Sequence, residues 1–326
     1  MQLADRHGRV ATDLRVSLTD RCNLRCHYCM PAEGLEWMPN EQILTNSEVI
    51  RLIGIAVNRL GVTNVRFTGG EPLLRKGLPE IVAATHQLGA RTALTTNGLG
   101  LQHLAQPLKD AGLDRVNVSL DSVDRATFEA ITRRDRLADV IAGLEAADAA
   151  GLRPVKVNAV LLRHLNEDEA PELMRWCIER GYELRFIEQM PLDPQHGWTR
   201  ADMITADETL ELLSASYRLT ALDGRGSAPA ERYLVDDGPH AIGIIGSVTR
   251  PFCGDCDRVR LTADGQVRNC LFAREESDLR TALRAGASDT ELAERWVLAM
   301  ASKLPGHGID DPKFLQPSRP MSAIGG

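Results

Sequence analysis

The 326-residue sequence predicts an α/β fold whose parallel sheet is open or only partly closed. The main observation is that six short β-like runs alternate with helical segments over the first two-thirds of the chain, as right-handed βαβ units require. Eight such alternations would indicate a closed TIM barrel, whereas six indicate an open or partial one. The strands are expected at Leu14–Thr19, Asn64–Gly69, Arg91–Asn97, Arg115–Asp121, Arg153–Leu162 and Glu183–Met190.

The helical segments between these runs carry start and stop signals. The clearest helix spans Asn46–Leu60, with Asn46 or Ser47 as its N-cap and Gly61 as its stop. A second helix is expected over Pro171–Arg180, and Cys177 within it is expected to be a buried small hydrophobe.

The pattern changes after about Pro191. A helix is expected at Ala206–Ser214, β-like segments at Tyr217–Leu222 and Ala241–Ser247, and a hairpin over Val259–Arg268 that turns at Asp264-Gly265. Helices follow, and the tail is rich in proline and glycine. We therefore expect two regions, residues 1–190 and residues 191–326.

Composition excludes several classes of protein. Apolar residues make up 43% and charged residues 25%, as in ordinary globular proteins. The net charge of −7 argues against a broad nucleic-acid surface, and no apolar run reaches the roughly 18 residues that span a bilayer. The N-terminus has no signal-peptide pattern, so a cytoplasmic location is expected. An odd count of seven cysteines argues against a disulfide framework.

Three of the cysteines, Cys22, Cys26 and Cys29, follow the first strand with the spacing C-x3-C-x2-C. Three thiolates can ligate three irons of a [4Fe–4S] cube and leave the fourth iron open for a substrate or cofactor. The alternative is a zinc loop, which needs a fourth ligand that His27 could supply.

A second set, Cys253, Cys256 and Cys270, has the spacing C-x2-C-x13-C and again lacks a fourth cysteine. It too could hold a cluster with an open iron. Zinc is the alternative here as well, with His240, His307 or a carboxylate completing the site.

Five basic side chains form another group of candidate site residues. Arg15, Arg66 and Lys156 lie within apolar strands, where an unpaired charge is costly, and Arg258 and Arg260 point the same way in an extended chain. Such a set requires an anion of high charge, and a nucleoside triphosphate fits. No Walker A loop is present, so a P-loop NTPase is excluded.

Polar or glycine-rich clusters also end four of the expected strands. Barrel-like α/β folds carry their reactive groups at these strand ends. The Gly69-Gly70-Glu71-Pro72 cluster alone could be an ordinary βα turn, and Met190 alone could be core filler. The clusters are Asp20–Cys29, Gly69–Pro72, Thr95–Gly98 and Ser119–Asp121.

The first cysteine motif, with Tyr28 just before its last cysteine, is similar to the signature of the radical S-adenosylmethionine (SAM) superfamily. With the second cysteine set, Arg258-x-Arg260 and the terminal Gly325-Gly326, the chain closely resembles the GTP 3′,8-cyclases of molybdenum cofactor biosynthesis from about Leu14 to Gly326. The resemblance implies a partial (β/α)6 TIM-like barrel followed by an Fe–S-binding region of mixed strands and helices.

The resemblance also assigns the site. It implies two [4Fe–4S] clusters, on Cys22, Cys26 and Cys29 and on Cys253, Cys256 and Cys270, with guanine on the open iron of the second. It implies SAM contacts at Tyr28, Gly70, Ser119 and Met190. It implies GTP contacts at Arg15, Arg66, Thr95, Lys156, Arg258 and Arg260. The Gly325-Gly326 tail is expected to insert toward the active site and to be needed for turnover.

The implied activity is a radical SAM lyase that cyclises GTP to (8S)-3′,8-cyclo-7,8-dihydroguanosine triphosphate. The implied partners are a low-potential electron donor and, as product acceptor, a cyclic pyranopterin monophosphate synthase, with the chain a monomer or homodimer. Two alternatives stay open: a peptide-modifying radical SAM enzyme with an auxiliary cluster, and a non-catalytic iron–sulfur or zinc regulatory protein.

Overall fold

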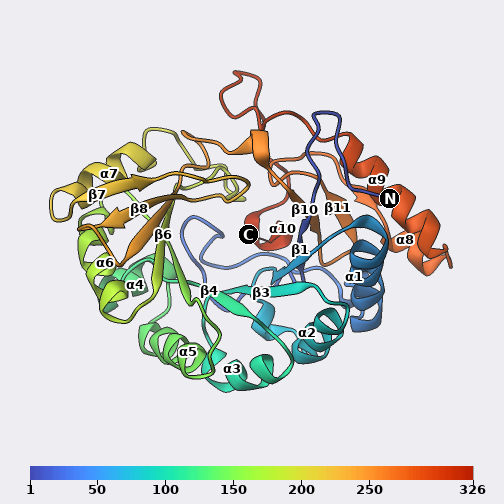
Figure 1. The fold of residues 1–326 in the computed structure, drawn as a ribbon, viewed down its shortest axis with the longest axis horizontal. Helices are drawn as coiled ribbons and strands as arrows, with labels where there is room; N and C mark the ends of the chain where they lie inside the picture. The colour runs from blue at the N-terminus through green and yellow to red at the C-terminus, as the bar shows by residue number, and fades with distance from the viewer. Residues whose placement is uncertain (326) are drawn as a thin grey trace.

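A computed structural model describes residues 1–325 and confirms the α/β fold (Figure 1). One twelve-stranded sheet runs in the order β12-β11-β10-β1-β2-β3-β4-β5-β6-β9-β8-β7. Its strands are β1 (Asp13–Ser17), β2 (Asn64–Thr68), β3 (Arg91–Thr96), β4 (Arg115–Ser119), β5 (Lys156–Val160), β6 (Glu183–Ile187), β7 (Leu219–Leu222), β8 (Glu231–Val235), β9 (Ala241–Ile245), β10 (Arg258–Leu261), β11 (Gln266–Arg268) and β12 (Ser277–Asp278).

All six expected strands of the first region are present as β1 to β6, and each pairs in parallel with the next. The C-terminal region extends this parallel run at both ends, because β10 pairs with β1 and β9 pairs with β6. The order does not join the two ends of the sheet within residues 1–325, so the barrel is partial, as expected.

Two strand expectations needed correction. The expected strand Arg153–Leu162 is shorter, with β5 at Lys156–Val160; Pro154 has no N–H to donate to a sheet ladder. The second correction is β8, which pairs antiparallel with β7 and β9 and was not expected.

The helices cover the outer face of the sheet, and the C-terminal helix lies on its inner side (Figure 1). The apolar alternate residues of the strands, such as Leu14, Val16 and Phe67, are fully buried in the core that includes the apolar faces of these helices. The helices are α1 (Asn46–Leu60), α2 (Leu78–Gln87), α3 (Leu101–Asp110), α4 (Arg125–Thr132), α5 (Leu137–Ala149), α6 (Ala170–Glu179), α7 (Ala206–Ser214), α8 (Arg280–Arg284), α9 (Asp289–Ala301) and α10 (Met321–Ile324).

Helix α1 has the expected bounds, and Gly61 ends it in the left-handed conformation. Its N-cap is neither Asn46 nor Ser47 but Thr45, which forms a capping box with Glu48. Helix α6 matches the expected Pro171–Arg180 segment to within one residue, and its Cys177 is fully buried as predicted.

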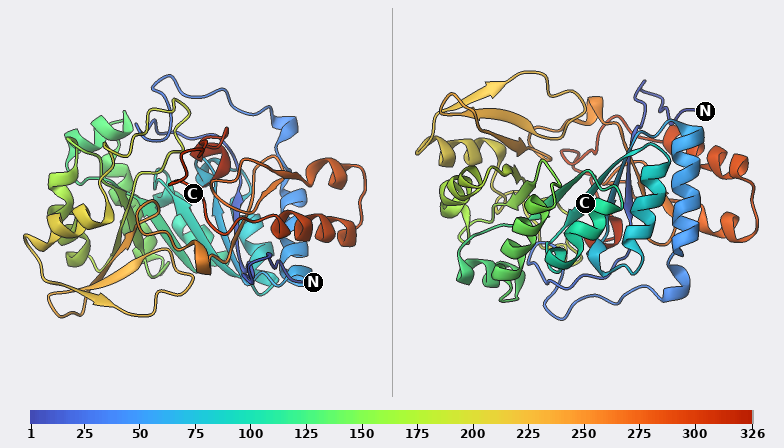
Figure 2. Two further views of the ribbon diagram at one scale, coloured as in Figure 1. Left: turned by 90° about the horizontal axis from the view of Figure 1, so that it is seen from above. Right: turned by 60° about the horizontal axis from the view of Figure 1, so that its bottom comes forward.

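The hairpin expected over Val259–Arg268 is formed by β10 and β11, and Gly265 at its turn has φ +79°. After it, α8 and α9 pack beside α1 through ion pairs such as Arg51–Asp289 and Arg284–Glu48. In both views of Figure 2 the red α10 lies well inside the outline of the molecule, whereas the N-terminus lies at its edge. No helix within residues 1–325 combines the length and apolarity needed to cross a membrane.

Candidate active site

A cavity of about 720 Å³ lies on the inner face of the sheet. Its volume falls within the roughly 300–1,000 Å³ that small-molecule sites occupy. Its wall includes all six expected GTP contacts, three of the four expected SAM contacts (Tyr28, Ser119 and Met190) and all three cysteines of the second set. Among the described residues, Gly70 and the three cysteines of the first set are not part of this wall.

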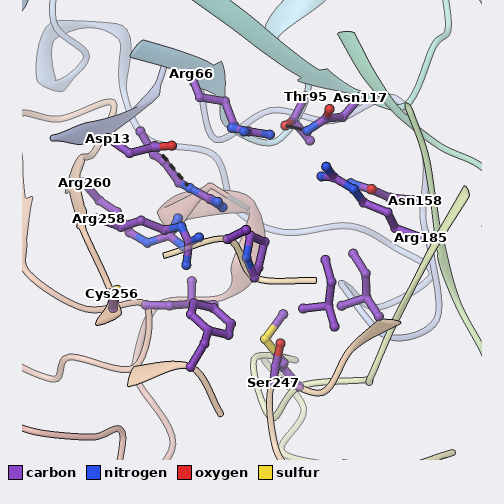
Figure 3. A pocket seen from close by; sticks show the side chains of 18 of the residues that line it. Asp13, Arg66, Thr95, Asn117, Asn158, Arg185, Ser247, Cys256, Arg258 and Arg260 are labelled. Atoms are coloured by element: carbon purple, nitrogen blue, oxygen red, sulfur yellow. Dashed lines mark hydrogen bonds and ion pairs between the residues drawn. The ribbon is translucent and has the colours of Figure 1, made fainter. Parts of the chain in front are cut away.

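Arg15, Arg66 and Arg260 come together because their strands are in register. Arg15 on β1 lies opposite Arg66 on one side and opposite Arg260 on the other. The side chains of Arg66, Arg258 and Arg260 lie on one side of the cavity in Figure 3. The row of cations is therefore a consequence of parallel pairing among β10, β1 and β2.

Arg258 and Arg260 are buried and Arg15 and Arg66 are half-buried, without enough negative charge beside them to match their own. Burial, followed by the nearby charges of Arg258 and Arg66, lowers the pKa of Arg15 to about 9. Burial likewise lowers the pKa of Arg66 to about 10. The Nε atoms of Arg15, Arg66 and Arg258 are buried and have no hydrogen-bond partner among the described residues. The wall therefore offers several unpartnered N–H donors to an anion that supplies several acceptors.

Asp13 is the acidic member of this cluster. Burial alone would raise the pKa of its carboxyl, but the charges of Arg15, Arg66, Arg258 and Arg260 outweigh that effect and lower it. The nearest ion-pair contact is long, at 3.9 Å from Asp13 Oδ1 to Arg15 Nε. One carboxylate at this distance leaves the cluster with excess positive charge.

The opposite wall is built by β3 to β6. It carries the expected Thr95 and Lys156, and the ammonium of Lys156 pairs with Glu183. It also carries Arg185, which sequence analysis did not single out and whose pKa burial lowers to about 10. Figure 3 shows Arg185 beside Asn158, across the cavity from Arg258 and Arg260.

Two amides also lie on this wall, and neither was among the expected ligand contacts. The Oδ1 atoms of Asn117 and Asn158 are buried without a hydrogen-bond partner among the described residues. Alternation along β4 and β5 puts them on the same face as Ser119 and Lys156, and that signal could have found them. They offer polar contacts for a ligand between the two walls.

The first cysteine loop follows β1 directly and is pressed against the turn after β2. A Cβ on Gly70 would lie 2.4 Å from the carbonyl oxygens of Asp20 and Arg21, so only glycine fits there. Glu71 accepts hydrogen bonds from the backbone N–H groups of Asn97 and Leu73 and from the Thr96 hydroxyl, and burial raises its pKa to about 7. The turn thereby fixes the cysteine loop against the ends of β2 and β3.

The thiols of Cys22, Cys26 and Cys29 lie near one another, and all three residues are half-buried. Burial, together with the neighbouring Cys22, raises the pKa of Cys29 to about 12. The pKa of Cys26 is raised well above its usual value by burial and by the charges of Asp121, Cys29 and Cys22. Three thiolates crowded in this way need metal cations to neutralise them, which fits an iron cluster.

Tyr28 links this loop to the cavity. Its hydroxyl donates a 2.8 Å hydrogen bond to Asp121 Oδ2, and Asp121 Oδ1 accepts from the Val160 N–H. Burial raises the pKa of Asp121 to about 6. The ring of Tyr28 is therefore held at the cavity wall by a fixed hydroxyl.

The second thiol set lies on the far side of the cavity. Cys253 begins a short 3₁₀ turn, Cys253–Asp255, and Cys256 caps its end, while Cys270 follows β11. Burial raises the pKa of Cys253, and the charges of Cys270 and Cys256 add to the effect. For Cys256, burial is outweighed by Lys303 and Arg258, which lower its pKa.

All seven cysteines, which lie within the described residues, are free thiols. No three or more His, Cys, Asp or Glu side chains among residues 1–325 are gathered tightly enough to hold one metal ion. A four-iron cube spreads its thiolates more widely than a single tetrahedral ion does, so neighbouring thiols that do not converge are compatible with it.

The C-terminal tail also contacts residues of the site. Arg260 donates a hydrogen bond to the carbonyl oxygen of Gly325, and the backbone N–H of Ser322 lowers the pKa of the Cys29 thiol. Gly325 has φ +84°, and a Cβ there would lie 2.7 Å from Thr68 Cγ2. Gly326, the other half of the expected diglycine, lies outside the described residues.

The fold and the arrangement of the thiols are those of the radical SAM class of proteins. The structure resembles that of SuiB from Streptococcus suis, with a TM-score of 0.61 and 16% identity, over 93% of this chain and 68% of that one. A SAM-bound structure of SuiB gives a TM-score of 0.58 and 14% identity, over 85% and 67% of the two chains. Residues 16–177 match the radical SAM superfamily, and residues 182–309 match the family described as Molybdenum Cofactor Synthesis C.

Close relatives narrow the class. The chain is 63% identical over 328 residues to the GTP 3′,8-cyclase of Streptomyces coelicolor, covering 99% of this chain and 96% of that protein. It is 61% identical over 331 residues to the GTP 3′,8-cyclase of Mycolicibacterium smegmatis, covering 99% and 92%. The chain therefore belongs to the GTP 3′,8-cyclase family.

Proposed function

We propose that the chain is a radical SAM lyase that cyclises GTP to (8S)-3′,8-cyclo-7,8-dihydroguanosine 5′-triphosphate, the first step of molybdenum cofactor biosynthesis. Membership of the GTP 3′,8-cyclase family supports the activity. One observation supports placing this activity at the cavity. Its wall carries both the arginines whose Nε atoms lack a partner among the described residues and the three thiols of the second set.

The cations bind the triphosphate. The Nε–H groups of Arg15 and Arg66 have no acceptor within residues 1–325, and charged hydrogen bonds to phosphate oxygens would satisfy them. Arg258 and Arg260 extend the same wall, while Thr95 and Lys156 meet the ligand from the other side. Holding the nucleotide at several points fixes the ribose relative to the reacting centre.

Cys22, Cys26 and Cys29 hold the first [4Fe–4S] cluster, and the SAM contacts are Tyr28, Gly70, Ser119 and Met190. When bound, the cluster and SAM together supply the one-electron reductive chemistry that starts the reaction. The contribution of this chain is positional: the Tyr28–Asp121 hydrogen bond fixes one side of the SAM site, and the close-packed Gly70 turn fixes another.

Cys253, Cys256 and Cys270 hold a second [4Fe–4S] cluster, whose open iron takes the guanine base. These thiols share the cavity wall with Arg258 and Arg260, so a bound nucleotide can meet both. Gly325 lies beside Arg260, and the Gly325-Gly326 tail is required for turnover.

The remaining assignments complete the proposal. A low-potential electron donor supplies electrons, and a cyclic pyranopterin monophosphate synthase takes the product. The protein acts in the cytoplasm as a monomer or homodimer, without nucleic acid or membrane as partner. The radical SAM region covers residues 1–190, and the cluster- and substrate-binding region covers residues 191–326.

The test is anaerobic incubation of reconstituted protein with SAM, dithionite and each nucleoside triphosphate in turn. We expect 5′-deoxyadenosine formation coupled to loss of GTP, with the other nucleotides left intact. SAM cleavage without loss of any nucleotide would favour the peptide-modifying alternative, and no SAM cleavage would favour a regulatory protein.

A further inference from the structure

Lys303 is a buried cation directly beside the second thiol set. It follows α9 and is only 4% exposed. Its Nζ donates to the backbone oxygen of Cys256 at 3.2 Å, to Cys256 Sγ at 3.4 Å and to the backbone oxygen of Arg258 at 2.9 Å. An ammonium has three donors, so these contacts use all of them.

The charge of this ammonium is not matched by a carboxylate, since no ion pair joins Lys303 to an Asp or Glu in the part of the chain that the structure describes. A buried, unpaired ammonium is costly. Of its three acceptors, only the sulfur of Cys256 can carry a negative charge. The buried ammonium therefore lies against a sulfur that the proposed cluster would hold as a metal-bound thiolate.

The segment around Lys303 also holds the other two cysteines of the set. Asn269, next to Cys270, donates to the backbone oxygen of Ala299 at 2.9 Å and to the Ser302 hydroxyl at 3.0 Å. Arg9 donates to the backbone oxygen of Cys253 at 2.6 Å and to those of Leu304 and Pro305. Residues 302–305 thus anchor both cysteine loops, which keeps the Lys303 ammonium in a fixed place.

We propose that Lys303 is the positioning residue of the second cluster: its charged N–H···S bond fixes the Cys256 thiolate and makes the cluster easier to reduce. The inference rests on the proposed second cluster. Hydrogen bonds to ligand sulfur and nearby positive charge withdraw electron density from the iron, which raises its reduction potential.

The test uses the full-length chain with Cys22, Cys26 and Cys29 replaced by Ala, so that iron at the second set is observed alone. In this background Lys303→Met removes the charge at similar length, Lys303→Arg keeps it, and Lys313→Met removes the charge of an exposed lysine as control. Iron content and the midpoint potential, from a redox titration followed by electron paramagnetic resonance, are measured for each.

We expect about four irons per chain in the parent protein. Lys303→Met should make one-electron reduction at least tenfold less favourable, which is about 59 mV downward. Lys303→Arg should shift the potential less, and Lys313→Met should leave it unchanged. Assembly in Lys303→Arg but not in Lys303→Met would also support the charge requirement.

Equal reduction potentials in the parent and in Lys303→Met would overturn the inference. Loss of the cluster in both Lys303→Met and Lys303→Arg would also overturn it, because that result would indicate a packing role alone. Absence of iron from the parent would overturn both this inference and the second cluster. A normal cluster with the expected shift in this background, combined with no GTP cyclisation by the protein that keeps all its cysteines, would overturn only the proposed function.

Discussion

Arg258 and Arg260 share a strand face and a cavity wall, but they are held differently. Arg258 donates to the Ser227 carbonyl and lies over the Phe252 ring, whereas Arg260 donates to the Gly325 carbonyl. Both bonds are to neutral oxygens and leave the positive charge unmatched. A triphosphate would therefore gain more from these side chains than their present partners do.

Replacing Arg258 or Arg260 by Ala should weaken GTP binding at least about tenfold, because a charged hydrogen bond contributes roughly 1.5–3 kcal/mol. Equilibrium binding of GTP to reconstituted protein measures the effect. Arg125→Ala, at an exposed arginine on α4, is the control and should bind GTP normally. Unchanged affinity in both cavity variants would count against the triphosphate site.

Glu71 predicts a pH effect on stability. Burial raises its folded-state pKa from 4.5 to about 7, so the folded protein binds this proton more tightly than the unfolded chain does. Its contribution is greatest below pH 4.5 and is lost as the pH rises toward 7. The difference in the free energy of unfolding between wild type and Glu71→Gln should change by up to about 3 kcal/mol over that range. Urea unfolding of both proteins across the range measures it; a constant difference would contradict the assignment.

The sequence revealed some site residues and not others for a physical reason. A charge inside an apolar strand is visible in the sequence, and that test found Arg15, Arg66 and Lys156. Applied to the strand Glu183–Ile187, it would also have found Arg185. Lys303 carried no such signal, because its burial and its contact with Cys256, 47 residues away, arise only from tertiary packing.

At the scale of elements, the clearest test concerns α10 and Gly325, the residue that follows it. Gly325 combines a positive φ with close approach to Thr68, Ser17 and Gly69, a position that a side chain would not fit. Deleting Gly325 and Gly326, or replacing Gly325 by Ala, should leave expression, iron content and GTP binding near normal and abolish the cyclised product.

The matched control for this tail is Gly54→Ala, since Gly54 lies in α1 with nothing within 4 Å of an added Cβ. It should be fully active. Product is measured by mass spectrometry after anaerobic turnover. Full activity in the truncated protein would remove the tail from the mechanism.

The elements that could be predicted were those with local signals. Alternation and turn residues located β1 to β6 and the β10–β11 hairpin, because their patterns do not depend on distant contacts. The N-cap of α1 was wrong by one or two residues, since several neighbouring side chains could cap and only the capping box with Glu48 selects Thr45. The pairing of β9 and β10 at opposite ends of the parallel run depends on tertiary structure and had no sequence signal.

At the scale of the whole molecule, the proposal of two clusters predicts how much iron the protein binds. Anaerobic reconstitution should give about eight irons per chain, and replacing Cys22, Cys26 and Cys29 by Ala should remove about half and abolish SAM cleavage. Iron and zinc are measured together. Zinc in the second thiol set of active protein would contradict the two-cluster account.

The central claim is that the cavity holds GTP for cyclisation to the 3′,8-cyclo product. The new bond between C3′ and C8 replaces the C3′–H bond, so the hydrogen on C3′ must be removed. The most direct measurement is turnover of GTP deuterated at C3′ with SAM and dithionite under anaerobic conditions, followed by mass spectrometry of the products. We predict that 5′-deoxyadenosine gains one deuterium and that a cyclised nucleotide triphosphate forms with it. Formation of 5′-deoxyadenosine without deuterium, with GTP recovered intact, would contradict the account.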